Sequence, residues 1–257
     1  MNKFFAATAL LLLIWGCSFL SKSEQKPAVA PIVHTIIFID KTQSVNVNER
    51  FVAQKYQQAI RDLVQNNIRQ AGDQLEVYFI HENTSKARAL SLTCRSELEN
   101  AAQNLSPTDR EAAQTAFEMA LKREQTMFLS QSLAKLNQQN GGSSNQMTDI
   151  WASLPVVAKA SENGAEVKVY YLSDMIESMR GAERRDFHKQ APQSNDQAQE
   201  WAKTDAQKLK ENNLNAAQIK ILLPFEPTAS TRENNPTVTL YWKTLFQELG
   251  AGNIEEL

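Results

Sequence analysis

Glycine, cysteine and histidine are scarce in this sequence, and the few that occur exclude several classes of site. Its 257 residues include eight glycines, none of which forms a Gly-x-Gly-x-x-Gly turn or a Walker loop, so the usual nucleotide cradles are absent. The two cysteines, Cys17 and Cys94, cannot build a four-thiolate zinc site, and the three histidines show no His-Glu-x-x-His spacing. Positive charge is not in excess either: 27 Lys and Arg stand against 29 Asp and Glu, which argues against nonspecific nucleic-acid binding.

The first twenty residues have the pattern of an export signal. Lys3 precedes an almost wholly apolar run at 4–15, which is the length of a signal-peptide core and short for a bilayer span. The run leads into Ile14-Trp15-Gly16-Cys17, which resembles a bacterial lipobox: an aliphatic residue, a variable one, a small one and then the cysteine. An uncleaved membrane anchor over 4–20 is the alternative.

The pattern predicts an exported bacterial protein tethered to a membrane. We expect a signal peptide at 1–16, lipidation of Cys17 with a polar, Pro/Ala-rich tether over 17–32, and a globular domain over 33–252. The expected location is the cell envelope, with the lipid chain as the membrane contact. Ser18, directly after the cysteine, fits outer-membrane sorting if the cell has two membranes.

Strand-like and helix-like patterns alternate along the predicted domain. Buried strands are indicated at 34–40, 75–80, 166–173 and 218–223, the last clear strand, with a short edge strand at 89–93. Helices are indicated at 52–71, 106–138, 149–160, 197–212 and 236–250. The stretch 94–140 reads as a mainly helical insertion. This alternation predicts an α/β fold with a doubly wound, mostly parallel sheet flanked by helices.

Three oxygen-bearing clusters stand where ligands bind in such a sheet. Asp40, Thr42 and Ser44 follow the first strand, Thr148 opens a later helix, and Asp174 follows a later strand. Ligands of doubly wound sheets bind beyond the carboxyl ends of central strands, so we expect these side chains to converge. Hard oxygen donors without histidine or thiolate suit Mg²⁺ or Mn²⁺ better than zinc or copper.

The set resembles the metal-ion-dependent adhesion site of von Willebrand factor A-type domains, over roughly Val33 to Gly252. Asp40-Lys41-Thr42-Gln43-Ser44 matches that family's Asp-x-Ser-x-Ser loop, Thr148 its lone threonine and Asp174 its last acid. The resemblance implies that these residues hold Mg²⁺ or Mn²⁺ and that an acidic side chain of a partner protein completes the metal shell. The glycines usual before Thr148 and after Asp174 are absent, so we expect both loops to be tighter or differently shaped.

Three functions stay open at this point. The first is a non-enzymatic, cation-dependent protein-binding module on a membrane, without a nucleic-acid partner. The second is a metal-free envelope scaffold whose helical region at 117–136 holds neighbours together; Thr148 would then only cap a helix, and the loop after Asp40 would be an ordinary Asx turn. The third is a phosphatase, because the first strand and its acid superficially resemble haloacid dehalogenases. Those enzymes need a second Asp at position 42, where this chain has Thr.

Overall fold

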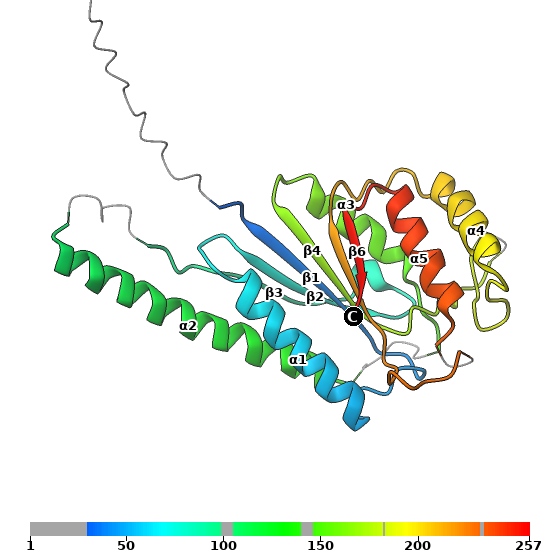
Figure 1. Cartoon of the computed structure of the whole chain (residues 1–257), viewed down its shortest axis with the longest axis horizontal. Coiled ribbons are helices and arrows are strands. Elements are labelled where there is room, and N and C mark those ends of the chain that lie inside the picture. Colours follow the sequence, from blue (N-terminus) through cyan, green and yellow to red (C-terminus); the bar gives the residue numbers. More distant parts are fainter. Residues whose placement is uncertain (1–29, 99–104, 140–145, 182, 232–233) are drawn as a thin grey trace, which may run out of the picture. The chain divides into compact units, whose positions relative to one another are not determined.

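A six-stranded sheet forms the centre of the chain (Figure 1). Its order is β3-β2-β1-β4-β5-β6; β3 is antiparallel to β2, and every other neighbouring pair is parallel. The predicted doubly wound, mostly parallel α/β fold is therefore confirmed. The strands are β1 (Val33–Asp40), β2 (Gln74–Ile80), β3 (Arg88–Thr93), β4 (Glu166–Leu172), β5 (Gln218–Leu222) and β6 (Asn253–Glu256).

The computed structural model describes residues 30–98, 105–139, 146–181, 183–231 and 234–257. Within it, Pro31–Leu257 form one compact unit. The predicted signal peptide at 1–16, Cys17 and nearly all of the tether lie outside the described residues. In the part of the chain that is described, no helix is both long enough and apolar enough to cross a membrane.

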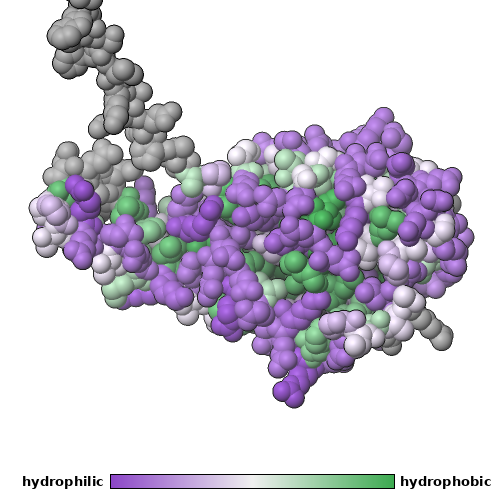
Figure 2. Space-filling model, in the orientation of Figure 1, coloured by the Kyte–Doolittle hydropathy of each residue, from purple (hydrophilic) through white to green (hydrophobic). Residues whose placement is uncertain are grey.

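Helices cover both faces of the sheet, with α1 and α2 on one side and α3, α4 and α5 on the other (Figure 1). Successive strand residues point to opposite faces, so Ile36 and Phe38 pack with the second group while Ile37 and Ile39 pack with the first. Most of the surface in view is hydrophilic, with small separate apolar patches (Figure 2). The helices are α1 (Arg50–Asn67), α2 (Pro107–Asn137), α3 (Leu154–Ser161), α4 (Asn195–Lys208) and α5 (Pro236–Glu248), with short 3₁₀ turns η1 (Thr84–Lys86) and η3 (Trp151–Ser153).

Two elements differ from the sequence expectation. The helix predicted from 149 begins later, as η3 followed by α3. Two hydrogen bonds hold the preceding segment out of a helix: Asp149 N donates to His81 O (3.3 Å), and Thr148 N donates to the side chain of Ser178 at Oγ (2.8 Å). The strand at 218–223 is not the last one. Residues Asn253–Glu256 form β6, which pairs in parallel with β5 at the sheet's edge.

The stretch expected to be an insertion divides into two parts. Its main element, α2, is one continuous helix whose second half joins the layer beside α1, with Phe128, Ser132 and Leu136 buried. No residue of α2 before Phe128 is buried. The part of α2 from Leu121 onward therefore packs on the domain core, and the part before it adds no side chain to that core.

Candidate metal centre

The candidate site lies where the chain leaves the two central strands. β1 and β4 are parallel neighbours, with Ile39 opposite Leu172, so Asp40 and the residues after Leu172 emerge side by side at the carboxyl edge of the sheet. From this point the chain goes from β1 towards α1, and from β4 towards the opposite layer. Diverging connections of this kind leave a crevice at the switch point of a doubly wound sheet.

Asp40 is fully buried and its carboxylate is held from both sides. Its Oδ1 accepts hydrogen bonds from the main-chain N of Thr42 (2.9 Å) and from Thr42 Oγ1 (2.5 Å). Its Oδ2 accepts one from Ser173 Oγ (2.6 Å). Each carboxylate oxygen offers about two acceptor positions, so Oδ2 is the atom of Asp40 that keeps room for another electropositive group.

Asp174 brings a second buried carboxylate to the same place. Burial, reinforced by the negative charge of Asp174, raises the pKa of Asp40 to about 7, against hydrogen bonds from Ser173 and Thr42 that lower it. Burial also raises the pKa of Asp174, against hydrogen bonds from Ser44 and from the main chain of Ile176 that lower it. Two desolvated like charges are thus adjacent, and the hydroxyl donors only partly relieve them.

The loop after β1 supplies the hydroxyls that face these carboxylates. Thr42 Oγ1 lies 3.3 Å from Ser44 Oγ, and Ser44 in turn bonds Asp174. A hydroxyl that gives its proton to a carboxylate keeps its oxygen lone pairs free. The structure therefore brings together four of the five residues expected from the sequence: Asp40, Thr42, Ser44 and Asp174.

Thr148, the fifth, is buried and is fixed through its main chain. Its N–H donates to Ser178 Oγ at 2.8 Å, and its carbonyl accepts from the N–H of Ser178 at 3.0 Å. These bonds tie the Thr148 segment to the segment that follows Asp174. In the described part of the chain no hydrogen bond joins the Thr148 side chain to Asp40 or Asp174, so its role as a ligand stays a prediction.

Ser173 was not among the expected ligands, yet it is central to the cluster. Its hydroxyl donates to Asp40 and accepts from the N of Met175 (2.9 Å), so it links the two strand ends. The available signal was its position directly before Asp174 at the end of a buried strand. Met175 has φ +60, a left-handed conformation that favours glycine, and it occupies the position where the resemblance expects a glycine. The loop thus takes a glycine-like shape without glycine.

The residue set fits a hard cation rather than a soft one. Among the described residues, no group of three or more His, Cys, Asp or Glu side chains is placed to hold a metal. A cation at this edge would rest on two carboxylates and neighbouring hydroxyls, an all-oxygen set of the kind that suits Mg²⁺ and Mn²⁺. An adjacent cavity of about 490 Å³, lined by Ser44, Asn46, Glu49, Phe225 and Glu226 among others, gives access from solvent.

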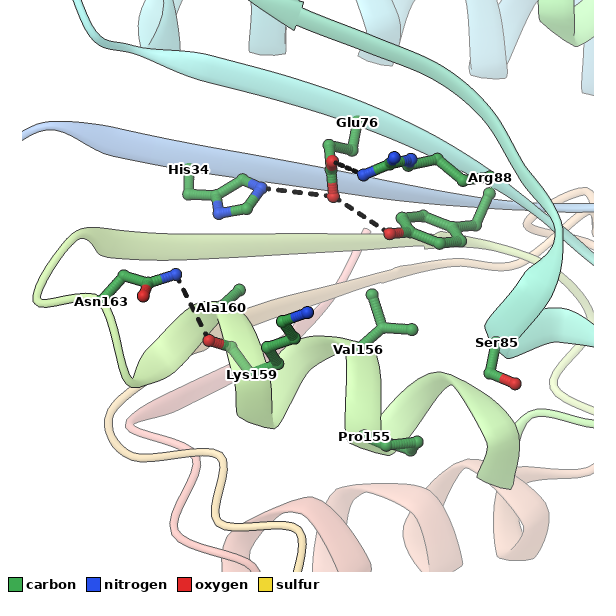
Figure 3. Close-up of a pocket in the computed structure, with 10 residues that line it drawn as sticks. His34, Glu76, Ser85, Arg88, Pro155, Val156, Lys159, Ala160 and Asn163 are labelled. Atoms are coloured by element: carbon green, nitrogen blue, oxygen red, sulfur yellow. Dashed lines mark hydrogen bonds and ion pairs between the residues drawn. The ribbon is translucent and has the colours of Figure 1, made fainter.

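A different charged cluster lies on β1 and β2, facing α3 (Figure 3). Glu76 accepts hydrogen bonds from Tyr78 Oη (3.1 Å) and Arg88 Nη1 (2.8 Å), and its carboxylate lies 3.5 Å from His34 Nε2. Burial raises the pKa of Glu76, but the neighbouring His34 and the hydrogen bond from Arg88 lower it to about 2. Beside this cluster is a cavity of about 360 Å³ that Lys159 also lines.

A third cluster supports the loop that carries Thr148. Arg184 pairs with the carboxylates of both Asp149 and Glu177, and its guanidinium lies 4.9 Å from the centre of the Trp151 ring. Glu177 also accepts from the N of Ile150 at 2.7 Å. These bonds explain the geometry of the loop. Arg184 gives Asp149 and Glu177 an ion-pair partner, and no such ion pair is formed by Asp40 or Asp174 among the described residues.

The comparisons with known proteins find likeness only among solved structures. No model of a protein family matches the sequence, and no curated protein matches it. A von Willebrand factor type A protein from Catenulispora acidiphila is 11% identical over 86% of this chain and 41% of that chain, with a TM-score of 0.36. The manganese-loaded TRAP protein of Plasmodium vivax is 12% identical over 80% of this chain and 62% of that chain, also with a TM-score of 0.36.

A third similar structure is proximal thread matrix protein 1 from the mussel byssus, with a zinc-occupied MIDAS motif. It is 12% identical over 84% of this chain and 47% of that chain, with a TM-score of 0.33. The chain spans about half the length of these structures. The order and direction of its own strands establish the α/β fold independently of them.

Proposed function

We propose that residues 33–252 form a von Willebrand factor A-type binding module that uses a divalent cation to engage an acidic group on a partner protein. The observation that carries the proposal is the buried Asp40–Asp174 pair at adjacent strand ends, with hydroxyls turned towards it. Neither carboxylate forms an ion pair among the described residues, and the neighbouring Lys41 directs its ammonium to the carbonyl of Leu136. Mg²⁺ or Mn²⁺ would supply the missing positive charge. The module is proposed to be non-enzymatic and held at a bacterial envelope membrane by a lipid on Cys17.

The residues of this chain have distinct parts in such a site. Asp40, through Oδ2, and Asp174 would neutralise the cation, while Thr42, Ser44 and Thr148 would offer neutral oxygens. Two carboxylates balance a dication without excess negative charge, so the site stays able to accept one more anionic ligand. Ser173 positions Asp40 by holding its Oδ2 side, and the cavity beside Ser44 gives a partner side chain room to approach.

Metal titration of the full chain in detergent tests the first step. Calorimetry with Mg²⁺ and with Mn²⁺ should show binding to the wild type and a loss of at least about tenfold in affinity for Asp40→Ala and for Asp174→Ala. Asp62→Ala, an exposed acid on α1, is the matched control and should bind like the wild type. Equal heats from all four proteins would contradict the proposed site.

The partner chemistry is tested with a short capped peptide that carries one glutamate. Linkage requires that if the peptide carboxylate completes the metal shell, peptide and metal each tighten the binding of the other by the same factor. The peptide with glutamine in place of glutamate is the control and should leave metal affinity unchanged. Identical behaviour of both peptides, together with intact metal binding, would reject acidic recognition while keeping the metal site.

The metal-free scaffold is the alternative that the structure keeps open, because α2 is long and its part before Leu121 contributes no side chain to the core of the described chain. It predicts that chelator and Asp40→Ala both leave partner binding unchanged. It also predicts that substitutions on α2 abolish that binding.

A further inference from the structure

The N-terminal part of α2, before Leu121, contributes no side chain to the hydrophobic core of the described chain. No side chain before Phe128 is buried, although the helix runs without a break from Pro107 to Asn137. Figure 1 shows this part continuing beyond the end of the sheet. Isolated helices of a few turns are marginal in water, and most helical stability comes from packing one face against a second surface. A second surface is therefore expected for this part of α2.

The side of α2 opposite its buried residues carries alanines and methionines together with two charged residues. We call it the outer face, and it consists of Asp109, Ala112, Ala116, Met119, Arg123 and Met127, which follow one another at spacings of three or four residues. Met119 and Met127 are 55% and 41% exposed, which places them among the few large apolar side chains of the described chain that face solvent. The alanines between the charged ends would let another helix approach closely, and exposed methionine is common on binding surfaces.

The charges of the outer face match those of a second α2 helix that runs antiparallel to the first. Asp109 lies seven residues before Ala116 and Arg123 lies seven residues after it, so both share the face of Ala116 at two-turn spacing. Among the described residues Arg123 forms no ion pair. In an antiparallel pair of helices centred on Ala116, each Asp109 would meet the Arg123 of the other copy. A twofold axis requires this kind of self-complementarity.

We infer that the outer face of α2 is the contact of a symmetric dimer of this chain, in which two α2 helices pack antiparallel about Ala116. Antiparallel helices also align their macrodipoles favourably. The contact involves about five turns with small side chains, which is less than most stable interfaces bury. The dimer is accordingly weak and reversible, and its formation depends on protein concentration.

Cysteine cross-linking in the full chain tests the geometry. Ala116→Cys should be linked to a second copy by a short bismaleimide, because the two thiols lie at the centre of the contact. Gln114→Cys is the matched control, since it is exposed on the same helix but faces away from the outer face. The wild type controls for the two natural cysteines; Cys94 is buried, and burial raises the pKa of its thiol to about 12, so it stays unreactive.

Charge exchange tests the pairing independently of how stable each variant is. In the Ala116→Cys background, Asp109→Arg alone and Arg123→Asp alone place like charges opposite each other in a homodimer, and the linked fraction should fall about tenfold. Mixing the two variants, carried on chains of different length, restores both opposite-charge pairs in the mixed dimer. Cross-links should then return, and only between the two unlike chains.

Three results would overturn the inference. The first is Ala116→Cys linking no more than Gln114→Cys. The second is linking that does not fall when the protein is diluted. The third is a mixture of the two charge variants that links no better than either alone, while circular dichroism shows both folded. In the first case the outer face would be free or would serve a different protein.

Discussion

The sheet carries buried carboxylates in two places, and their surroundings are opposite in sign. On β2, Glu76 is surrounded by donors, with His34 and Arg88 beside it, and its pKa is lowered to about 2. At the carboxyl edge, Asp40 forms no ion pair among the described residues; another carboxylate and neutral hydroxyls surround it, the Lys41 ammonium donates to the Leu136 carbonyl, and the pKa of Asp40 is raised to about 7. Glu76 has its counter-charge within the chain, whereas Asp40 has no ion-pair partner among the described residues. That contrast is the physical reason for placing ligand binding at the carboxyl edge.

Neutralising Glu76 should give the largest effect and should be destabilising. Glu76→Gln leaves Arg88 and His34 without the charge they face, and we expect a loss of about 2 kcal/mol in the free energy of unfolding. Arg88 is partly exposed, which keeps the loss below that of a fully buried pair. Urea unfolding near pH 7 measures it, with Glu111→Gln on the exposed part of α2 as the control. A loss no larger than that of the control would mean the cluster is not stabilising.

The same variant also gives a pH test. The pKa of Glu76 in the folded protein is about 2, below its ordinary value of 4.5. Its negative charge therefore stabilises the fold fully above about pH 4.5, and this stabilisation is lost as the pH falls through about 2. The difference in unfolding free energy between wild type and Glu76→Gln should therefore be full at neutral pH, smaller near pH 3 and close to zero near pH 2. Unfolding midpoints over this range measure it. A difference that does not change with pH would show that the loss comes from shape and not from charge.

Neutralising one acid at the carboxyl edge should have the opposite sign when cations are absent. A carboxylate whose folded pKa is raised destabilises the fold once it ionises, so in chelator near pH 8 Asp174→Asn should raise the free energy of unfolding by about 1 kcal/mol. With Mg²⁺ or Mn²⁺ present, the wild type should gain stability and the variant should not. Thermal unfolding with and without metal measures both. A variant less stable than the wild type in chelator would show that the pair needs no cation.

One side of this contrast, the carboxyl edge, was visible in the sequence. Asp40 and Asp174 each follow a continuous apolar run, and parallel central strands place such residues at one edge of the sheet. The resemblance then supplied the roles of Thr42 and Ser44. Glu76 could not be recognised, because it stands within a strand-like run and its partners come from positions far along the chain: His34 from β1 and Arg88 from β3.

The elements that were missed depend on tertiary contacts. Asn253–Glu256 contains one strongly apolar residue, so no alternation marks it as a strand, and it exists because β5 offers an unpaired edge. The helix expected from 149 starts late because Glu177 accepts from the main chain at Ile150 and Asp149 is drawn to Arg184. Such bonds join residues about thirty positions apart, and no local pattern announces them.

Positive φ angles occur at both ends of the sheet, and they fall on non-glycine residues at both, since Ala216 (φ +60) lies in the turn before β5. In the turns that precede β2 and β4, positive φ angles fall on glycines, Gly72 (φ +93) and Gly164 (φ +72), which adopt them without steric cost. In the loop after β4 the positive φ falls on Met175. This residue is fully buried, and its carbonyl accepts a hydrogen bond from Trp242 Nε1 at 2.7 Å. Its packing and this bond hold a conformation that costs an ordinary residue roughly 1–2 kcal/mol.

The smallest predicted effect isolates that strain. Met175→Ala and Met175→Gly both remove the buried side chain, but only glycine also relieves the steric strain of the left-handed backbone. The glycine variant should therefore have a free energy of unfolding about 1 kcal/mol higher than the alanine variant. At Ala198, buried within α4, replacing alanine by glycine should instead cost about 1 kcal/mol, because helical φ favours alanine. Urea unfolding of the three variants and the wild type decides the signs. If glycine were also the less stable residue at position 175, the loop that carries Asp174 would hold no strain, and its shape would follow from the hydrogen bonds of Ser173 alone.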